Sequence, residues 1–180
     1  MKTLDPNSTL CWWLTGLSGA GKTTLATALV AALRQRGESA CLLDGDEVRL
    51  GLCRDLGFSP ESRHENMRRV AEMACLLNKN GIHAVVALVS PTLEGRALAR
   101  GIIGQDRFLE VHVATPLEVC QARDPKGLYA QAKTNPAMGM TGVQASYEPP
   151  PEPALSLSTQ DAHLPDLLAQ LLALDSALQA

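Results

Sequence analysis

The sequence predicts an α/β fold, with a mostly parallel central β-sheet flanked by helices and with a mobile lid. Short apolar runs typical of buried strands alternate along the chain with segments of helical periodicity, as expected for a parallel sheet. The chain has 180 residues, 46% of them hydrophobic, which is enough for one compact domain with a real core. Two segments, 44–60 and 123–153, break the regular pattern. We therefore expect a single domain over residues 1–180, with residues 1–9 as a short N-terminal extension.

The first predicted unit is a strand, a helix and a second strand. The apolar run 10–15 predicts the first strand and the run 40–43 predicts the second. Between them lies a helix that ends near Gly37, a residue type common just after a helix. Its apolar positions recur at helical spacing and are Leu25, Ala28, Leu29, Ala32 and Leu33. These elements form one βαβ unit.

The second helix is predicted to begin at Ser59, with Pro60 in its first turn, and to end near Gly81. Its apolar face carries Met67, Val70, Ala71 and Ala74. Buried strands are predicted at 84–89 and 110–113. This part of the chain therefore continues the alternation of helix and strand.

The C-terminal part is predicted to contain a lid, a last strand and a last helix. Long loops in a compact domain are usually lids or linkers, and the charged and small residues at about 123–148 favour a mobile lid. The prolines that follow lead into a strand at 155–158. The last helix has a stripe of leucines that can close one side of the sheet: Leu164, Leu167, Leu168, Leu171, Leu172 and Leu178.

Composition excludes several classes of protein. The formal net charge is −3 and basic residues are interleaved with acidic ones, so the chain lacks the positive field that binds nucleic-acid polymers. The five cysteines are odd in number and widely spaced, which favours buried thiols in a reducing cytoplasm. No apolar run is long enough to span a bilayer, and the N-terminus does not read as a secretory signal. The expected location is cytoplasmic, without a membrane partner.

A phosphate-binding loop is predicted at the end of the first strand. In the stretch WWLTGLSGAGKTT, Gly16, Gly21, Lys22 and Thr23 satisfy the G-x-x-x-x-G-K-[ST] pattern, between a strand and a helix. The glycines let the backbone turn N–H groups toward phosphate oxygens at the helix N-terminus. Lys22 adds a positive charge near the β and γ phosphates, and the Thr23 hydroxyl can help to hold Mg²⁺. ATP and Mg²⁺ are therefore the expected cofactors, and the predicted cofactor-binding residues here are Gly16, Ser18, Gly19, Ala20, Gly21, Lys22, Thr23 and Thr24.

The loop alone does not determine what happens to the phosphate. The alternative of an ordinary flexible glycine turn is weakened by the complete motif in its expected context. A switch GTPase would also need a guanine-reading N-K-x-D element, which the DPKG sequence at 124–127 does not supply. Motor and transporter ATPases are normally larger. Transfer of the γ-phosphoryl group to a small acceptor is the better interpretation for a chain of this size.

An acceptor site is predicted beside the phosphate loop. Asp44 and Asp46 follow the second strand at the carboxyl edge of the sheet, where ligands bind in open α/β folds, although an Asp-Gly-Asp sequence is also common in turns. Arg63 and Asn66 lie in the early turns of the next helix, followed by Arg68 and Arg69, and offer a cationic face for an anionic acceptor or a merely solvated one. Phe58, before that helix, could stack on a base or act as a hydrophobic staple.

Four quoted segments together resemble the adenylylsulfate kinase family. They are GLSGAGKTT, LDGDEVRLGLCRDLGFSPESRHENMRRVAE, the SP at Ser90 and Pro91, and TPLEVCQARDPKGLYAQA. They occur in the same order as in the family, and the likeness spans nearly the whole chain. The resemblance implies a P-loop kinase fold and phosphorylation by MgATP of the 3′-hydroxyl of adenosine 5′-phosphosulfate (adenylyl sulfate). The products would be 3′-phosphoadenosine 5′-phosphosulfate and ADP, in sulfate activation.

The resemblance also implies roles for individual residues. Asp44 would serve the metal, and Asp46 is the better candidate for the general base. The residues implied to bind the acceptor are Asp44, Asp46, Arg49, Phe58, Arg63, Asn66, Val89, Ser90 and Met140. Ser90 matches a serine that the family can carry as phosphoserine, although direct transfer is the expected mechanism. Arg123 and Lys126 would belong to the lid over ATP, with Lys126 neutralising charge on the moving phosphoryl group. The implied catalytic residues are Lys22, Asp46, Ser90 and Lys126.

The acceptor side departs from the family pattern. Met138, Met140 and Gln144 stand where the family has a lysine, an aromatic residue and an aspartate, and Thr92 and Leu93 replace an aromatic residue and an arginine. Met140 loses stacking on adenine that is worth about 1–3 kcal/mol per base in nucleic-acid sites. Two other hypotheses therefore stay open: a kinase for another nucleotide-linked acceptor, such as a cytidine diphosphate derivative, and a nucleotide-binding module without catalysis.

Two groups of residues are predicted to have no part in the chemistry. His64, His83, His112 and His163 lack the spacing of metal ligands. Trp12 and Trp13 are expected to pack in the core and at the edge of the first strand, with a homodimer contact as the alternative.

Overall fold

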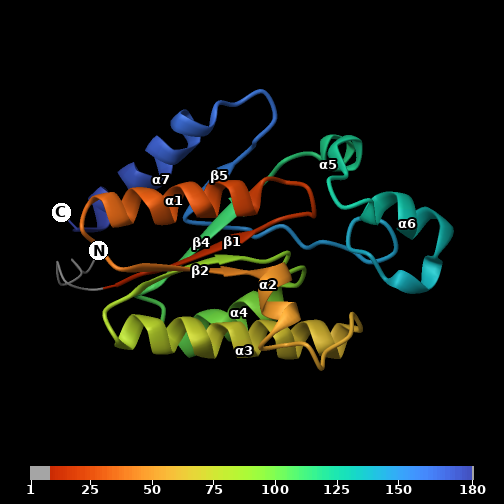
Figure 1. Cartoon of the computed structure of the whole chain (residues 1–180), viewed down its shortest axis with the longest axis horizontal. Coiled ribbons are helices and arrows are strands. Elements are labelled where there is room, and N and C mark those ends of the chain that lie inside the picture. The colour runs from red at the N-terminus through yellow and green to blue at the C-terminus, as the bar shows by residue number, and fades with distance from the viewer. Residues whose placement is uncertain (1–8, 180) are drawn as a thin grey trace.

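The computed structural model describes residues 9–179 and shows a parallel sheet between two layers of helices (Figure 1). Within those residues the strands are β1 (Cys11–Thr15), β2 (Ala40–Asp44), β3 (His83–Ala87), β4 (Phe108–Val113) and β5 (Leu155–Leu157), in the order β2-β3-β1-β4-β5. All pairs are parallel, and β1 lies between β3 and β4. The predicted fold class is confirmed, and each predicted strand lies within two residues of an observed one.

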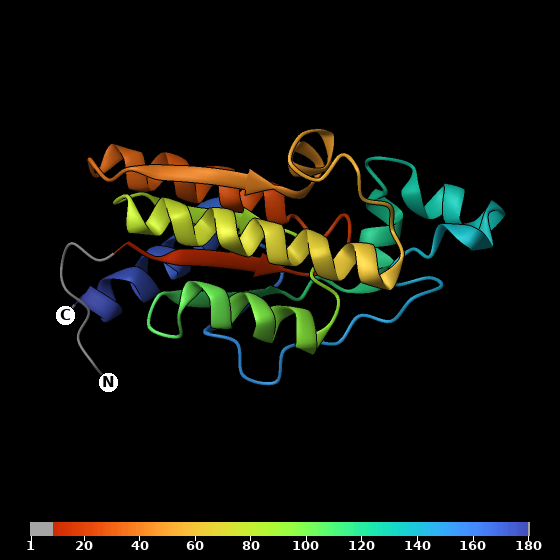
Figure 2. The same cartoon turned by 90° about the horizontal axis from the view of Figure 1, so that it is seen from below.

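Helices cover both faces of the sheet. In Figures 1 and 2, α1 (Lys22–Gln35) and α7 (Leu164–Gln179) lie on one face, and α3 (Pro60–Lys79) and α4 (Leu93–Ile103) lie on the other. The Ser59 side chain accepts a hydrogen bond from the Ser62 N–H and caps α3, with Pro60 in the first turn as predicted. None of the described helices is long and apolar enough to cross a membrane.

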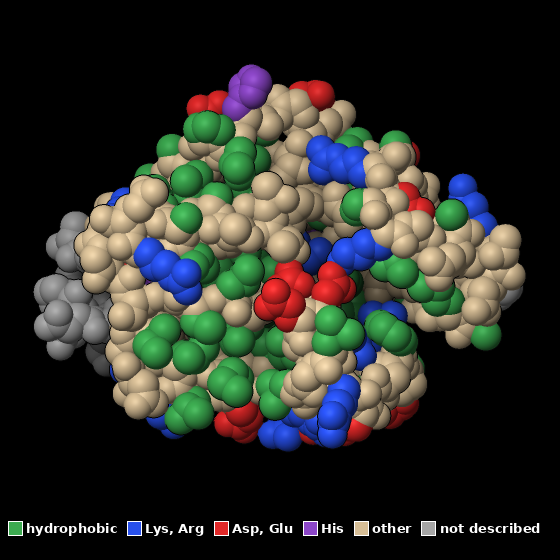
Figure 3. Space-filling view, in the orientation of Figure 1, with side chains coloured by type: hydrophobic (Ala, Val, Ile, Leu, Met, Phe, Trp, Pro, Cys, Tyr) green, Lys and Arg blue, Asp and Glu red, His purple; other side chains and the backbone are tan. Residues whose placement is uncertain are grey.

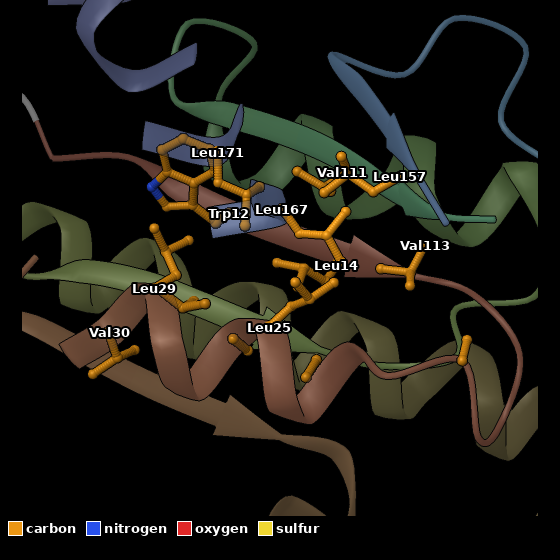
Figure 4. Close-up of a cluster of buried hydrophobic side chains, with 14 of the residues drawn as sticks. Trp12, Leu14, Leu25, Leu29, Val30, Val111, Val113, Leu157, Leu167 and Leu171 are labelled. Carbon is orange, nitrogen blue, oxygen red and sulfur yellow. The ribbon is translucent and has the colours of Figure 1, made fainter. Parts of the chain in front are cut away.

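The two faces of the sheet bury separate apolar clusters. Successive residues of a strand point to opposite faces, so Trp12 joins the cluster under α1 and α7 (Figure 4), while Trp13 joins the cluster under α3 and α4. Both indoles are 0% exposed. The predicted edge position and the alternative of a dimer contact are therefore wrong for these tryptophans, because β1 is a central strand covered on both sides.

The two segments without clear periodicity contain short helices. The segment 44–60 begins with α2 (Gly45–Leu50), and the predicted lid contains α6 (Leu128–Thr134) and a 3₁₀ turn at Pro136–Met138. A further short helix, α5 (Leu117–Arg123), leads from β4 into this region. Six or seven residues are too few for a clear apolar stripe, so the sequence does not reveal these helices. In Figure 2, α6 projects beyond the arrowheads of β1 and β2, at the carboxyl edge of the sheet.

Candidate active site

A cavity of about 830 Å³ opens at the carboxyl edge of the sheet. Its wall includes the loop after β1, the start of α2, the first turns of α3, the loop after β3 and the predicted lid. In Figure 3 acidic side chains over α2 meet basic side chains beside a hollow at this end of the molecule. Every predicted site residue lines the cavity except Gly16 and Ala20, which lie behind its wall. The topology therefore brings the two predicted sides of the site into one space.

Glycines give the loop after β1 its conformation. Gly16 has φ +150°, and a Cβ there would lie 2.5 Å from the Val113 carbonyl oxygen, closer than Cβ atoms approach other atoms in real structures. Gly19 and Gly21 have φ values of +78° and +96°, a region that L-residues rarely adopt. Lys22 then begins α1, a helix of 14 residues. The loop thus ends at the positive N-terminal end of a long helix, which favours an anion.

Lys22 supplies a buried cation to the cavity. Its Nζ donates a hydrogen bond of 2.7 Å to the Leu17 carbonyl oxygen, and the residue is only 8% exposed. Burial lowers the pKa of its ammonium group to about 8. The group is still mostly protonated at neutral pH, although less firmly than an exposed lysine.

Thr23 and Asp44 place two oxygen ligands side by side. The Thr23 hydroxyl donates a hydrogen bond of 2.7 Å to one carboxylate oxygen of Asp44. The other oxygen accepts the Asp46 N–H at 2.9 Å and so caps α2. The Asp-Gly-Asp sequence is therefore the start of a helix and not a free turn. Hydroxyl and carboxylate oxygens are the ligands that Mg²⁺ prefers, so these two residues fit the predicted metal site.

Asp46 forms an ion pair with Lys126 of the predicted lid. Both side chains are about half exposed, and they stand 80 positions apart in the sequence. The two predicted catalytic groups thus meet at the mouth of the cavity. The pair connects α2 with the loop between α5 and α6.

Two arginines lie over the ring of Phe58. The guanidinium carbon of Arg49 is 4.3 Å from the centroid of the Phe58 ring, and that of Arg63 is 5.5 Å from it. Burial lowers the pKa of both guanidinium groups, but arginine remains charged at neutral pH. Phe58 itself is 57% exposed, so it is no hydrophobic staple and presents an exposed aromatic ring with two guanidinium groups over it.

Asn66 and Ser90 form the floor on the acceptor side. Asn66 is 4% exposed, and its buried Oδ1 has no hydrogen-bond partner among the described residues. Ser90 has a left-handed φ of +46°, its Oγ accepts a 2.9 Å hydrogen bond from the Trp13 indole, and its carbonyl oxygen accepts a 2.7 Å hydrogen bond from Arg96. Asn66 thus offers a free acceptor, whereas Ser90 is held by its neighbours.

The lid residues that depart from the family pattern form a connected unit. Gln144 accepts the Met140 N–H at 2.9 Å and donates to the Ala132 carbonyl oxygen at 2.7 Å. Arg63 donates to the carbonyl oxygens of Phe58, at 3.0 Å, and Gly139, at 3.1 Å. Met140 is 6% exposed and lines the cavity. Arg63 therefore links the segments that carry Phe58 and Met140.

The predicted cationic face of α3 is smaller than expected, because two of its arginines are paired outside the cavity. Arg68 pairs with Glu65 and Glu72, and Arg69 pairs with Glu65 and Asp55, so the predicted cationic face does not extend to them. Neither lines the cavity.

Sequence reasoning missed two supports of the site. One is Arg96, which is 2% exposed and bonds Glu110 at 2.6 Å as well as Ser90. The other is the pair Thr115 and Thr159, whose hydroxyls donate hydrogen bonds to the Ala20 carbonyl oxygen of the phosphate loop. The only signal for Arg96 was an arginine on the apolar face of α4, and the threonines had none.

Comparisons with known proteins agree with one another. Residues 8–158 match the family model described as adenylylsulphate kinase. The adenylyl-sulfate kinase of Shewanella amazonensis is 51% identical over 159 residues, covering 88% of this chain and 80% of the relative. That of Shewanella pealeana is 48% identical over 167 residues, covering 93% and 82%. The structure of the Mycobacterium tuberculosis APS kinase CysC in complex with AMPPNP and APS is 40% identical, with a TM-score of 0.89, covering 94% of this chain and 98% of that one.

Proposed function

The chain belongs to the adenylylsulphate kinase family, and from that premise we propose that it is an ATP-dependent adenylyl-sulfate kinase. It transfers the γ-phosphoryl group of ATP to the 3′-hydroxyl of adenosine 5′-phosphosulfate and releases 3′-phosphoadenosine 5′-phosphosulfate and ADP. The observation that carries this proposal is that one cavity joins the glycine and lysine cradle to the arginines around Phe58.

The phosphate loop and α1 bind the triphosphate in this proposal. Backbone N–H groups around Gly19 and Gly21 and the Lys22 ammonium group surround its anionic oxygens. The Thr23 hydroxyl and the Asp44 carboxylate would hold Mg²⁺, consistent with their 2.7 Å contact. When bound, Mg²⁺ neutralises charge on the phosphates. Arg123, at the start of the lid, lines the same cavity.

Asp46 acts as the general base and Lys126 as the cation beside the moving phosphoryl group. Asp46 accepts the proton of the acceptor hydroxyl while that oxygen forms a bond to the γ-phosphorus and the bond to the bridging β–γ oxygen breaks. Lys126 is held at the same carboxylate by its ion pair, so closing the lid places it near the reacting atoms. Transfer is direct, because Ser90 is 2% exposed and its Oγ already accepts the Trp13 indole N–H.

The acceptor nucleotide lies between Phe58 and Met140. The exposed Phe58 ring offers a stacking surface, and the Met140 thioether gives apolar contact on the other side. Arg49 and Arg63 neutralise the anionic phosphosulfate, and the free Oδ1 of Asn66 accepts a hydrogen bond from the nucleotide. Val89 and Ser90 complete the floor of this half of the cavity.

An ATP-consumption assay tests the proposal. ADP release is measured with adenylyl sulfate, with a panel of other nucleotide-linked acceptors including cytidine diphosphate derivatives, and without acceptor. Release that depends on adenylyl sulfate supports the proposal. Release with a different acceptor only would assign the altered residues Met138, Met140 and Gln144 to a changed pocket. Tight ATP binding without release in any reaction would make the chain a binding module.

Three further predictions belong to this proposal. Residues 123–148 act as a mobile lid within a single domain, which closes on the cavity through the ion pair of Lys126 with Asp46 and the hydrogen bond from Arg63 to the Gly139 carbonyl oxygen. A cytoplasmic location agrees with five free cysteines among the described residues. A homodimer, if it forms, uses a surface other than the buried tryptophans, and sedimentation analysis tests it.

A further inference from the structure

Two threonines outside the predicted site support the phosphate loop from behind. Thr115 follows β4 and Thr159 follows β5. The carbonyl oxygen of Ala20 accepts hydrogen bonds from both hydroxyls, at 3.0 Å from Thr115 Oγ1 and 2.9 Å from Thr159 Oγ1. Ala20 is fully buried and does not line the cavity. The loop is therefore anchored on the side that faces away from the expected phosphates.

The hydrogen bonds of this threonine pair are mutually consistent. Thr115 Oγ1 accepts the Thr159 N–H at 3.1 Å, and Thr159 Oγ1 accepts an Arg123 N–H at 2.6 Å. Each hydroxyl proton is then available for the Ala20 carbonyl oxygen or for the other hydroxyl, which lies 2.9 Å away. A valine at either position would keep the shape and remove the bonds.

The anchored carbonyl determines where the next N–H points. In a trans peptide the C=O and the following N–H point in opposite directions, and the described backbone contains no cis bonds. The Gly21 N–H is therefore turned away from the threonines, and Gly21 lines the cavity. The close approach needs glycine at this position, because a Cβ there would lie 2.9 Å from Thr159 Cγ2.

Thr159 also contacts the first residue of the lid, Arg123. Arg123 donates to Thr159 Oγ1 at 2.6 Å and to the Thr159 carbonyl oxygen at 2.8 Å. It also reaches the Gly19 carbonyl oxygen at 3.3 Å. Thr159 thus bonds the phosphate loop through Ala20 and the lid through Arg123.

We propose that Thr115 and Thr159 are positioning residues of the nucleotide site, which orient the phosphate loop through Ala20, and that Thr159 also couples the loop to the lid through Arg123. The inference rests on the proposed function only in that the loop binds a nucleoside triphosphate. Neither threonine lines the cavity, so both act through the backbone of the loop, and Thr159 acts also through Arg123.

The test compares hydroxyl removal with hydroxyl retention. Thr159→Val and Thr115→Val remove the hydroxyl, Thr159→Ser keeps it, and Thr9→Val is the matched control, because Thr9 is also buried and donates a 2.8 Å hydrogen bond to the Asn78 carbonyl oxygen. Affinity for Mg²⁺ with AMPPNP is measured by titration calorimetry without acceptor, together with Tm and the KM values of both substrates.

We expect each valine variant at positions 115 and 159 to weaken nucleotide binding about tenfold. Thr159→Ser should stay within about twofold of the wild type, Thr9→Val should lower Tm only, and the KM for adenylyl sulfate at saturating ATP should be unchanged. Wild-type affinity in either folded valine variant overturns the proposal, as does a serine variant as weak as the valine variant. If Thr159→Val does not fold, Thr115→Val and Thr159→Ser decide on the same criteria.

Coupling to the lid has its own measurement. The variants Arg123→Gln and Thr159→Val are measured singly and combined. The fold-increase in the nucleotide dissociation constant of the double variant should be at least threefold smaller than the product of the two single fold-increases, because the two side chains share one set of bonds. Additive effects would overturn the coupling. A wild-type protein that binds AMPPNP but transfers no phosphoryl group to adenylyl sulfate would refute the proposed function and leave these binding tests intact.

Discussion

The burial of Lys22 predicts that triphosphate affinity decreases as the pH rises above 8. The pKa of this ammonium group is lowered to about 8, mainly by burial. The charge of Lys126 also lowers this pKa, whereas Cys120, Asp44 and Asp46 raise it. Phosphate oxygens beside the ammonium group favour its charged form, so binding raises the pKa again. Binding above neutral pH is therefore accompanied by proton uptake.

The size of the change in ATP affinity follows from the pKa of Lys22. At pH 9, one unit above it, about one free molecule in eleven still has a charged Lys22, and each pKa unit corresponds to about 1.4 kcal/mol. If the bound pKa is about 10 or higher, the dissociation constant of ATP should rise about tenfold between pH 7 and pH 9. Near pH 8 about half a proton should be taken up per nucleotide bound. The terminal phosphate does not contribute, because phosphate monoesters have a second pKa of about 6.

Titration calorimetry in two buffers with different ionisation enthalpies measures both quantities. Lys22→Arg is the control, because its guanidinium group stays charged throughout this range, so any affinity it keeps should not depend on pH. Constant wild-type affinity from pH 7 to 9 without proton uptake would refute the reasoning. An equal pH dependence in Lys22→Arg would show that a different group titrates.

Three other substitutions test separate parts of the site. Asp46→Asn should lower kcat about 10²- to 10⁴-fold with ATP affinity nearly unchanged, and an unchanged kcat would remove Asp46 from the proton transfer. Met140→Phe should lower the KM for adenylyl sulfate about fivefold or more by restoring stacking opposite Phe58, and no gain in steady-state assays would favour a different acceptor. Gly16→Ala should destabilise the fold by about 2–4 kcal/mol in denaturant unfolding, because its Cβ would lie 2.5 Å from a backbone oxygen of β4, and wild-type stability would contradict that geometry.

Features that depend on neighbours in the sequence were predicted well. The phosphate loop is a run of contiguous residues whose glycine spacing determines its backbone, and the structure has positive φ at Gly16, Gly19 and Gly21. The Ser59 cap and Pro60 likewise mark the start of α3 through local hydrogen bonding. Continuous apolar runs located the strands, because a strand of a parallel sheet is buried on both faces.

Partners distant in the sequence were not predictable in the same way. Arg63 and Arg69 look alike in the sequence, yet one lies beside Phe58 in the cavity and the other pairs with Asp55 and Glu65 outside it. Because an α-helix has 3.6 residues per turn, the two side chains point to different sides of α3, but only the packing of α3 decides which side faces the cavity. The six-residue helix α2 was missed because so short an element has no measurable apolar stripe.

The sequence by itself determined the phosphate loop, the alternation of strands and helices, and the residue types available for the site. Only the tertiary structure decided the strand order β2-β3-β1-β4-β5, the ion pair of Asp46 with Lys126 and the contact of Ala20 with Thr159. The physical reason is the difference in range between the interactions involved. Backbone conformation and apolar periodicity depend on residues a few positions apart, whereas ion pairs and hydrogen bonds act over a few ångströms between segments that only the folded sheet brings together.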